Sequence, residues 1–446
     1  MKAASALAPQ LSRGLVGPVR DSVAAFGVDS AGRRRVLVSA FACSPLWGSE
    51  PEVGWRWLQQ LARLHEVVLL THSYFKSHLE PALAGEGLEI EVHYFHAASP
   101  GLHPHTELNS RVYYLWWQWR VRAFVAELHR ARPLELIHHL TWGTFRFPCF
   151  LAGLGVPLVM GPLGGGDRAP LRFYDDLPFR SRAFECLRTL SLMWARIDPF
   201  ASWGPRQSVF VMCRTLQTLN MLPRQVRQRA AIVADVGCPP VDLSLRRAIV
   251  PSTDESVVRL LFAGRLLGLK GLSMAVGAMA RLKSQGYAVQ LDIAGEGPLR
   301  TFLTQRIRVL GLTNEVRLLG SLPRAELLCR YGQADLFLFP SLHDSGGTVV
   351  LEALSRGLPV ICLDLGGPPN FIDDTCGAVV ATRGRSRLEV EKALADSVAR
   401  IIAEPGALKR LSAGAAKRAQ DRSWERLVRA AYTLVHRELG WLPAIV

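Results

Sequence analysis

Two carboxylate side chains, Asp344 and Glu352, stand eight residues apart in the segment LHDSGGTVVLEAL. The apolar residues before Asp344 predict a buried strand, and the residues from Thr348 onward predict a helix that begins after a glycine pair. Eight residues is a little over two helical turns, so both acids can border one cleft. The free N–H groups at this helix start, around Gly346 and Gly347, can bind an anion. The alternative is a solvated loop aspartate and a surface glutamate on an ordinary helix.

Two basic side chains, Arg265 and Lys270, follow another apolar strand earlier in the chain, in the segment FAGRLLGLKG. An arginine can hold phosphate oxygens in a bidentate fork, and a lysine adds a point charge. Cations in this position would stabilise negative charge on a leaving phosphate. The pair therefore predicts a phosphate clamp, and the alternative is an arginine and a lysine that are merely solvated on a loop.

Glycine turns follow three other predicted strands. Gly295 and Gly297 form a Gly-x-Gly turn, which would let a flat base approach the backbone or would be an ordinary strand-to-helix turn. Gly48 lies in SPLWGSE, and Gly164 and Gly165 lie in GPLGGGD. Glycines at such places favour close approach to a ligand or a hinge, whereas the alternative is a merely flexible loop. We predict that these loops border the cleft.

The elements that must position these residues are short apolar strands that alternate with helices, a pattern typical of parallel sheets. One set of strands begins at residues 35–41 and a second set begins at 257–263. Between the sets, residues 239–255 contain three prolines and predict an interdomain linker. The predicted units are a flexible leader over residues 1–34, a first domain over 35–240 and a second domain over 256–423.

Two segments of the first domain fall outside the strand pattern. A long helix is predicted over residues 106–132, where aromatic and arginine residues between Tyr113 and Arg122 favour either a membrane-facing surface or packing in the core. Residues 168–205, rich in proline, arginine and aromatic residues, are predicted to cap or line the cleft.

The 446 residues carry a formal net charge of +15, which suits anionic ligands and an anionic membrane surface. No nucleic-acid motif accompanies the charge, so nucleic acid is not a predicted partner. The eight cysteines have no C-x-x-C spacing, which argues against a zinc or redox site and favours a reducing compartment. No metal-ligand spacing and no apolar run of membrane-spanning length stand out. We predict a cytoplasmic protein, peripheral to the inner face of the membrane, with no metal and no cofactor.

These motifs together resemble the family 4, or group 1, retaining glycosyltransferases. The resemblance depends on a G-R-x-x-x-x-K-G motif at residues 264–271 and on Pro340, Ser341, Gly347, Glu352, Ala353, Gly357, Pro359 and Val360. One departure is Asp344, which stands where the family has a glutamate. The resemblance implies an α/β fold of the GT-B type, with two doubly wound Rossmann-like domains facing a central cleft. It also implies that the last helix, 424–440, braces the first domain.

The resemblance assigns a role to each donor-binding motif. Asp344 would act on the reacting sugar, and Glu352 would accept hydrogen bonds from the ribose hydroxyls. Arg265 and Lys270 would neutralise the leaving diphosphate in place of a metal ion. The Gly-x-Gly turn would lie near the nucleoside.

Family members also carry an active-site histidine near the position of His138 and His139. The adjacent pair leaves the register open, and either histidine can be the one that faces the cleft. We take His139 as the catalytic candidate, with a buried structural histidine as the alternative.

The function implied is transfer of a sugar from a nucleotide-sugar donor to an acceptor hydroxyl, with retention of anomeric configuration. Segments such as SPLWGSEPEVGW resemble enzymes of bacterial surface polysaccharide or glycolipid assembly, so the expected acceptor is a sugar or a lipid-linked sugar. The alternatives are a nucleotide-sugar 2-epimerase of the same fold and a non-catalytic nucleotide-sugar-binding subunit.

Overall fold

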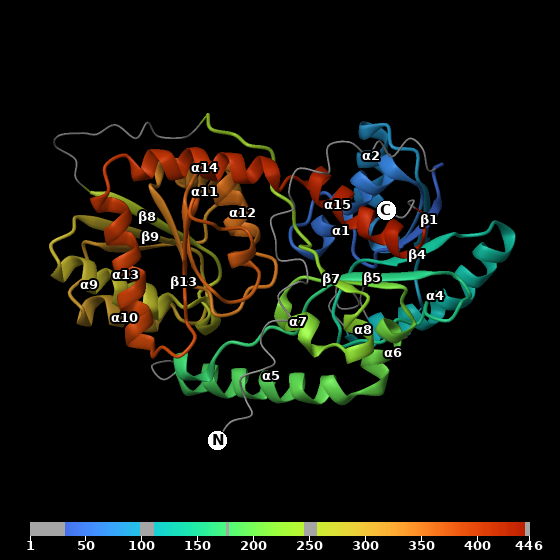
Figure 1. The fold of residues 1–446 in the computed structure, drawn as a ribbon, viewed down its shortest axis with the longest axis horizontal. Helices are drawn as coiled ribbons and strands as arrows, with labels where there is room; N and C mark the ends of the chain where they lie inside the picture. The colour runs from blue at the N-terminus through green and yellow to red at the C-terminus, as the bar shows by residue number, and fades with distance from the viewer. Residues whose placement is uncertain (1–31, 99–110, 175–177, 245–256, 442–446) are drawn as a thin grey trace, which may run out of the picture.

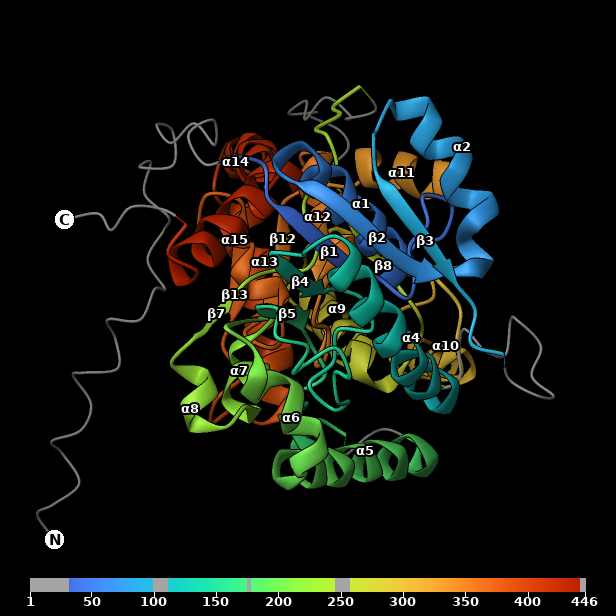
Figure 2. The ribbon, with the colours of Figure 1, turned by 90° about the vertical axis from the view of Figure 1, so that its right-hand side faces the viewer.

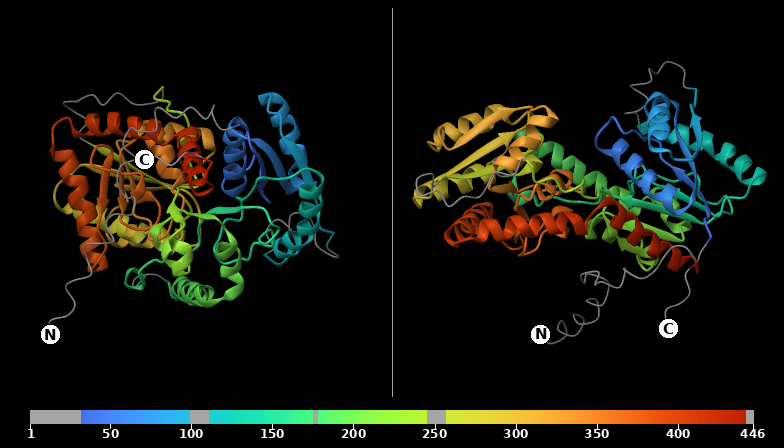
Figure 3. Two further views of the ribbon diagram at one scale, coloured as in Figure 1. Left: turned by 45° about the vertical axis from the view of Figure 1, so that its right-hand side comes forward. Right: turned by 90° about the horizontal axis from the view of Figure 1, so that it is seen from above.

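The computed structural model of the chain describes residues 32–98, 111–174, 178–244 and 257–441. It contains two parallel β-sheets, each packed against helices, and the two units lie side by side (Figure 1). Seen from above, helices cover both faces of the C-terminal sheet (Figure 3). The arrangement confirms the expected GT-B architecture of two doubly wound α/β units.

The N-terminal sheet has seven strands in the order β3-β2-β1-β4-β5-β6-β7. Its strand order reverses between β1 and β4, and in open α/β sheets a ligand binds beyond the carboxyl ends of the strands at such a point. The strands are β1 Arg35–Ser39, β2 Glu66–His72, β3 Glu91–Phe95, β4 Leu136–His139, β5 Leu158–Leu163, β6 Phe210–Cys213 and β7 Ala230–Ile232.

The C-terminal sheet has six strands in the order β10-β9-β8-β11-β12-β13, and its order reverses between β8 and β11. Strands β1, β11 and β12 are buried along their whole length, as expected for apolar strands covered on both faces. The strands are β8 Val258–Ala263, β9 Val289–Ala294, β10 Val316–Gly320, β11 Leu336–Phe339, β12 Val360–Leu363 and β13 Gly377–Val380.

Helices connect the strands and cover the sheets. Those of the N-terminal part are α1 Glu50–Leu64, α2 Lys76–Glu86, α4 Arg111–Ala131, α5 Phe179–Ile197, α6 Pro199–Gln207, α7 Leu216–Met221 and α8 Arg224–Arg227. Those that follow β8 are α9 Leu272–Ser284, α10 Arg300–Val309, α11 Arg324–Gln333, α12 Thr348–Ser355, α13 Arg387–Ala403, α14 Ala407–Asp421 and α15 Trp424–Glu438.

The end of the chain returns to the N-terminal unit, where α15 packs against α1 (Figure 1). The Tyr432 hydroxyl on α15 lies 2.9 Å from His138 Nδ1 on β4, and His436 Nε2 lies 3.1 Å from His65 Nε2. Both contacts are buried. Helix α15 is therefore part of the N-terminal unit, although it follows the C-terminal sheet in sequence.

The structure refines the two segments that lacked a strand pattern. In α4, a buried face of Tyr113, Tyr114, Trp117, Val121 and Val125 packs into the core. Most of the aromatic residues of α4 therefore pack in the core, as one of the two alternatives for this helix predicted. Residues 168–205 instead form mainly α5 and α6, and α5 lies along the outside of the molecule, below both units in Figure 1 and at the lower edge of Figure 2.

Several sequence predictions concern residues outside the described ranges. The leader over 1–34 falls almost wholly within residues 1–31, and most of the expected linker falls within 245–256. The domain limits at 240 and 256 therefore stay predictions.

Candidate active site between the two sheets

The reversal point of the C-terminal sheet brings together the loops that follow β8 and β11. The Leu342 N–H donates to the Leu269 carbonyl oxygen at 2.8 Å. Gly271 has a φ of 67°, and a Cβ atom there would lie 1.9 Å from the Pro340 oxygen, so only glycine fits this crossing. The two motifs that the sequence places 74 positions apart, at Lys270 and Asp344, therefore form one site.

Lys270 and Asp344 form an ion pair at this crossing. Lys270 Nζ is 2.6 Å from Asp344 Oδ2, and the two side chains are 16% and 18% exposed. The ammonium group also lies 5.3 Å from the centroid of the Phe339 ring. The lysine is thus held by a carboxylate at the place where the sequence predicts a phosphate clamp.

Asp344 also shapes the loop that starts α12. Its Oδ1 atom accepts the Gly347 N–H at 2.7 Å, and its carbonyl oxygen accepts the Gly367 N–H at 2.8 Å. Gly347 is in the left-handed conformation, with a φ of 64°. The carboxylate therefore positions the start of α12, where Thr348 begins the helix.

The N-terminal sheet contributes a buried charge cluster that faces this loop. Arg214 follows β6 and Asp235 lies just beyond β7, and Arg214 Nη1 is 3.0 Å from Asp235 Oδ2. Arg214 also lies 3.5 Å from Glu50 Oε1, and Glu50 accepts the Gly143 N–H at 3.0 Å. Burial alone would lower the pKa of Arg214, but the carboxylates of Asp235 and Glu50 raise it above its ordinary value.

A cavity of about 190 Å³ lies between the Asp344 loop and this charge cluster. The two sides approach closely, since a Cβ atom built on Gly346 would lie 3.4 Å from Asp235 Oδ1. The lining comes from both sheets: Ser49, Glu50, Val53, Arg214, Asp235 and Val236 on one side, and Asp344, Ser345, Gly346 and Thr348 on the other.

Asp235 has unused hydrogen-bonding capacity at this cavity. Its Oδ1 atom is buried and has no hydrogen-bond partner in the described part of the chain. Burial raises the pKa of Asp235, and Arg214 opposes that shift. An unpaired buried acceptor is costly unless a ligand or water completes it, so Asp235 is a candidate to bind a hydroxyl group.

Glu352 is buried, but it points toward α11 and does not line the cavity with Asp344. Its Oε1 atom is 2.7 Å from Arg324 Nη1, and its Oε2 atom accepts the Tyr331 hydroxyl at 3.3 Å. The structure thus excludes the alternative of a surface glutamate. Burial lowers the pKa of Arg324, but Glu352 raises it above its ordinary value, with a smaller contribution from Glu52 of α1. This edge of α11 therefore lies near the N-terminal unit.

Arg265 is exposed, and none of the described residues forms an ion pair or hydrogen bond with its guanidinium group. It lies just after β8 but outside the 190 Å³ cavity. A Cβ on Gly295 would lie 1.9 Å from the Gly264 oxygen, and one on Gly297 would lie 2.6 Å from the Leu266 oxygen. Packing between the loops after β8 and β9 therefore explains both glycines without a ligand, and their contact with a base stays a prediction.

The glycine loops of the N-terminal unit are also placed by packing. Gly165 has a φ of 89° with Thr144 beside it, and Gly164 lies against the Arg214 side chain. Gly48 is exposed, one residue before the N-cap of α1. Of these loops, only the residues after Gly48 reach the cavity, through Ser49 and Glu50.

The two adjacent histidines lie in the core of the N-terminal unit, on opposite faces of β4. His138 Nε2 donates to the Gly161 oxygen at 2.7 Å, and its other nitrogen bonds Tyr432. His139 is also buried and lies 3.1 Å from the Tyr114 hydroxyl, with no described partner for Nδ1. Burial lowers the pKa of each to about 4. Neither lines the cavity, so a catalytic role for His139 gains no support from its position.

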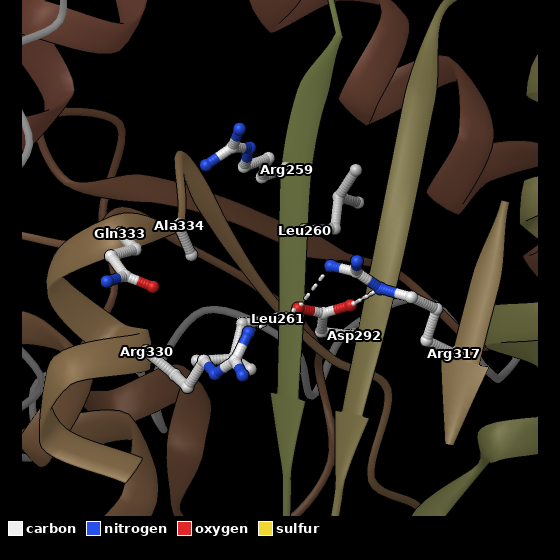
Figure 4. A pocket seen from close by; sticks show the side chains of 8 residues that line it. All are labelled: Arg259, Leu260, Leu261, Asp292, Arg317, Arg330, Gln333 and Ala334. Atoms are coloured by element: carbon white, nitrogen blue, oxygen red, sulfur yellow. Dashed lines mark hydrogen bonds and ion pairs between the residues drawn. The ribbon is translucent and has the colours of Figure 1, made fainter. Parts of the chain in front are cut away.

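A second pocket lies on the C-terminal sheet, away from the loops of the site (Figure 4). Its volume is about 40 Å³, too small for a nucleotide. Asp292 lies at its centre and forms ion pairs with Arg317 at 2.7 Å and Arg330 at 3.5 Å. This pocket is therefore a structural ion-pair cluster.

Sequence reasoning missed Arg214 and Asp235. Each is a single polar residue that follows a short strand, without a glycine motif to mark it. The signal that could have found them is their position, because the carboxyl ends of neighbouring parallel strands meet at one edge of the sheet. Glu50 stands inside the SPLWGSE motif, where only the glycine was interpreted as a site residue.

No group of three or more His, Cys, Asp or Glu residues suited to a metal ion occurs in the described ranges. Over the same ranges, no helix combines the length and the apolar character needed to cross a bilayer.

Residues 249–418 match the family model of the glycosyl transferases group 1. The match covers less than half of the chain. The matched segment contains both halves of the C-terminal site, from Arg265 and Lys270 to Asp344 and Glu352.

Curated relatives match part of this chain. Alpha-D-kanosaminyltransferase of Streptomyces kanamyceticus is 27% identical over 233 residues, which cover 49% of this chain and 58% of that protein. The amylovoran biosynthesis glycosyltransferase AmsK of Erwinia amylovora is 31% identical over 164 residues, covering 33% of this chain and 40% of that protein. The chain thus spans about two fifths to three fifths of the length of these relatives.

Solved glycosyltransferase structures resemble the fold of nearly the whole chain. The crystal structure of Anabaena HepE in complex with UDP superposes with a TM-score of 0.56 and 16% sequence identity. The match covers 91% of this chain and all of that one. At this identity the likeness shows the fold.

Proposed function

We propose that this chain transfers a sugar from a nucleotide-sugar to an acceptor hydroxyl at the cavity between its two sheets. The observation that carries the proposal is the Lys270–Asp344 pair, which lies at the reversal point of the C-terminal sheet and faces the Arg214–Asp235 cluster. The group 1 family and the transferase relatives support a transferase reaction.

The donor diphosphate is assigned to Lys270, Arg265 and the N-terminus of α12. Lys270 and Arg265 supply positive charge, and the N–H group of Thr348 at the start of α12 adds a hydrogen-bond donor. The Gly347 N–H is already bonded to Asp344 Oδ1. Glu352 is assigned to the ribose. The ribose hydroxyls would replace Arg324 as the hydrogen-bond partners of the Glu352 carboxylate. The UDP bound by the structurally similar HepE protein favours a nucleotide of this kind.

The reacting sugar and the acceptor are assigned to the cavity itself. Asp344 borders it from the C-terminal side, and the free Oδ1 atom of Asp235 can accept a hydrogen bond from an acceptor hydroxyl. In the reaction the bond between the sugar C1 and the phosphate oxygen breaks, and a bond from C1 to the acceptor oxygen forms on the same face. Because the new bond forms on the same face, anomeric configuration is retained. The acceptor proton passes to the leaving diphosphate, and Lys270 and Arg265 neutralise the diphosphate in place of a metal ion.

The acceptor is assigned to the surface polysaccharide or glycolipid class. One relative acts in amylovoran biosynthesis, and the net charge of +15 suits peripheral attachment to an anionic membrane face.

A thermal-shift panel of UDP, GDP, ADP and TDP tests the proposal. A ligand that binds only the folded protein raises the unfolding midpoint according to its affinity, so one diphosphate should raise it well above the others. Lys270→Ala should lose this rise, while Lys392→Ala, a change at an exposed residue of α13, should keep it. No rise with any diphosphate would contradict the proposal. Incubation with the nucleotide-sugar alone should give slow hydrolysis, and a changed sugar nucleotide would indicate the epimerase alternative.

A further inference from the structure

Helix α5 exposes an apolar face to solvent. The residues of this face are 54% to 81% exposed, although all are large hydrophobic side chains. They recur every three or four positions, which places them on one side of a helix. We call this side the α5 outer face, and it consists of Phe179, Leu187, Leu190, Met193, Trp194 and Ile197.

The opposite side of α5 carries the polar contacts to the rest of the molecule. Glu185 is buried and lies 2.7 Å from Arg188 Nε, and Arg188 Nη1 lies 2.7 Å from His343 Nε2. His343 directly precedes Asp344 in the loop of the site. An amphipathic helix of a globular protein normally turns its apolar side inward, whereas α5 buries Leu192 but turns its other described large apolar residues outward. A helix docked through polar contacts leaves its apolar side for a partner.

The position of α5 on the outside of the molecule favours binding to a broad, flat surface. Helix α5 lies along the outside of the molecule in both perpendicular views, clear of the two sheets (Figures 1 and 2). It is 19 residues long, and its exposed side is apolar. A helix of this kind can lie in the plane of a membrane interface with its apolar side inserted.

The exposed charged side chains described on α5 and α6 are basic, and the half-buried Asp198 between the two helices caps α6. Arg182 and Arg196 are exposed on α5 and Arg206 is exposed on α6, whereas Glu185, the one acid within α5, is buried against Arg188. Two copies of the chain that met through this face would bring like charges together. A bilayer with anionic lipids supplies both an apolar interior and the opposite charge.

We propose that the α5 outer face inserts into the surface of an anionic lipid bilayer. The proposal does not depend on the proposed glycosyl transfer, since it concerns a surface outside the cavity. Its consequence is that α5 holds the loop of Asp344 close to the bilayer through the Arg188–His343 contact.

Co-sedimentation with lipid vesicles tests the proposal. The wild-type chain should bind vesicles of phosphatidylcholine with phosphatidylglycerol, bind phosphatidylcholine vesicles weakly, and lose binding as salt is raised. The double variant Leu190→Glu/Trp194→Glu should reduce the partition coefficient by about tenfold or more, because it removes two inserted side chains. Arg182→Glu/Arg196→Glu should weaken binding to the anionic vesicles only.

The matched control changes exposed apolar residues elsewhere, Val309→Glu/Leu388→Glu on α10 and α13, and should bind as the wild type does. Light scattering without lipid measures whether the chain forms a dimer, which is the competing explanation for the exposed apolar face. The proposal is overturned if the wild type does not bind anionic vesicles, or if Leu190→Glu/Trp194→Glu binds as well as the control. It is also overturned if the wild type is a dimer that this variant dissociates, since the face would then join two copies.

Discussion

The ion pair between Lys270 and Asp344 leads to a prediction about nucleoside diphosphate binding. The lysine charge is already engaged at 2.6 Å before any phosphate arrives. Asp344→Asn keeps a side-chain oxygen that can accept the Gly347 N–H, so the loop retains its shape, but it removes the charge that competes for Lys270. The variant should bind the diphosphate at least as tightly as the wild type, while turnover of the nucleotide-sugar falls.

The magnitude follows from the strength of the competing contact. A hydrogen bond between charged groups contributes about 1.5–3 kcal/mol, and one to a neutral amide oxygen contributes about 0.5–1.5 kcal/mol. The difference of about 1–1.5 kcal/mol is what a phosphate gains at Lys270, and it corresponds to roughly tenfold tighter binding. The same difference should slightly lower the melting temperature, by about 2 °C.

Calorimetric titration with the selected diphosphate in the presence of EDTA measures the change directly. Asp396→Asn, at an exposed residue of α13, is the matched control and should leave both binding and turnover unchanged. If Asp344→Asn were folded but bound the diphosphate tenfold more weakly than the wild type, the competition argument would be refuted.

Four further results are expected. Arg265→Ala should keep the fold, because the side chain is exposed. It should lower kcat/KM by roughly a hundredfold, because it removes a preorganised cation. A near-normal kcat/KM would contradict the role of Arg265 in the phosphate clamp. Glu352→Gln should weaken diphosphate binding by roughly tenfold, since it removes a buried charged acceptor, and unchanged calorimetric affinity would exclude the ribose role. Activity should survive EDTA, and loss of activity that Mn²⁺ restores would show a metal requirement. The free energy of unfolding should fall as pH drops from about 6.5 to about 4. In this range histidines of the unfolded chain bind protons, whereas the buried histidines of the folded chain stay neutral. Equal denaturant midpoints at pH 7 and pH 5 would contradict this. Burial lowers the pKa of these histidines to about 4, and they are His72, His138, His139 and His343.

The sequence was informative where glycines and charges stand together at strand ends. The motifs at Lys270 and Asp344 could be assigned to one site because parallel strands deliver their carboxyl ends to one edge, and the structure joins them in an ion pair. The alternation of strands and helices likewise predicted both sheets. Each strand, helix and glycine turn is visible in the local pattern, and the rule for parallel strands then brings the distant motifs together.

Features that depend on distant packing could not be predicted in this way. The partner of Glu352 is Arg324, whose position is set by α11 and not by any motif. Arg214 and Asp235 become site residues only because the two sheets face each other. The apolar spacing of α5 is visible in the sequence, but a periodic helix is expected to turn that side inward, and only the structure shows it exposed.

The most direct test of the central claim is a crystal structure with the diphosphate that the thermal-shift panel selects. We expect the diphosphate to lie against Lys270, Arg265 and the start of α12, with the ribose at Glu352 and the cavity beside Asp235 left for the two sugars. A diphosphate bound elsewhere, such as at the Arg317–Asp292 pocket, or a nucleotide that leaves the Lys270–Asp344 pair intact and untouched, would contradict the account.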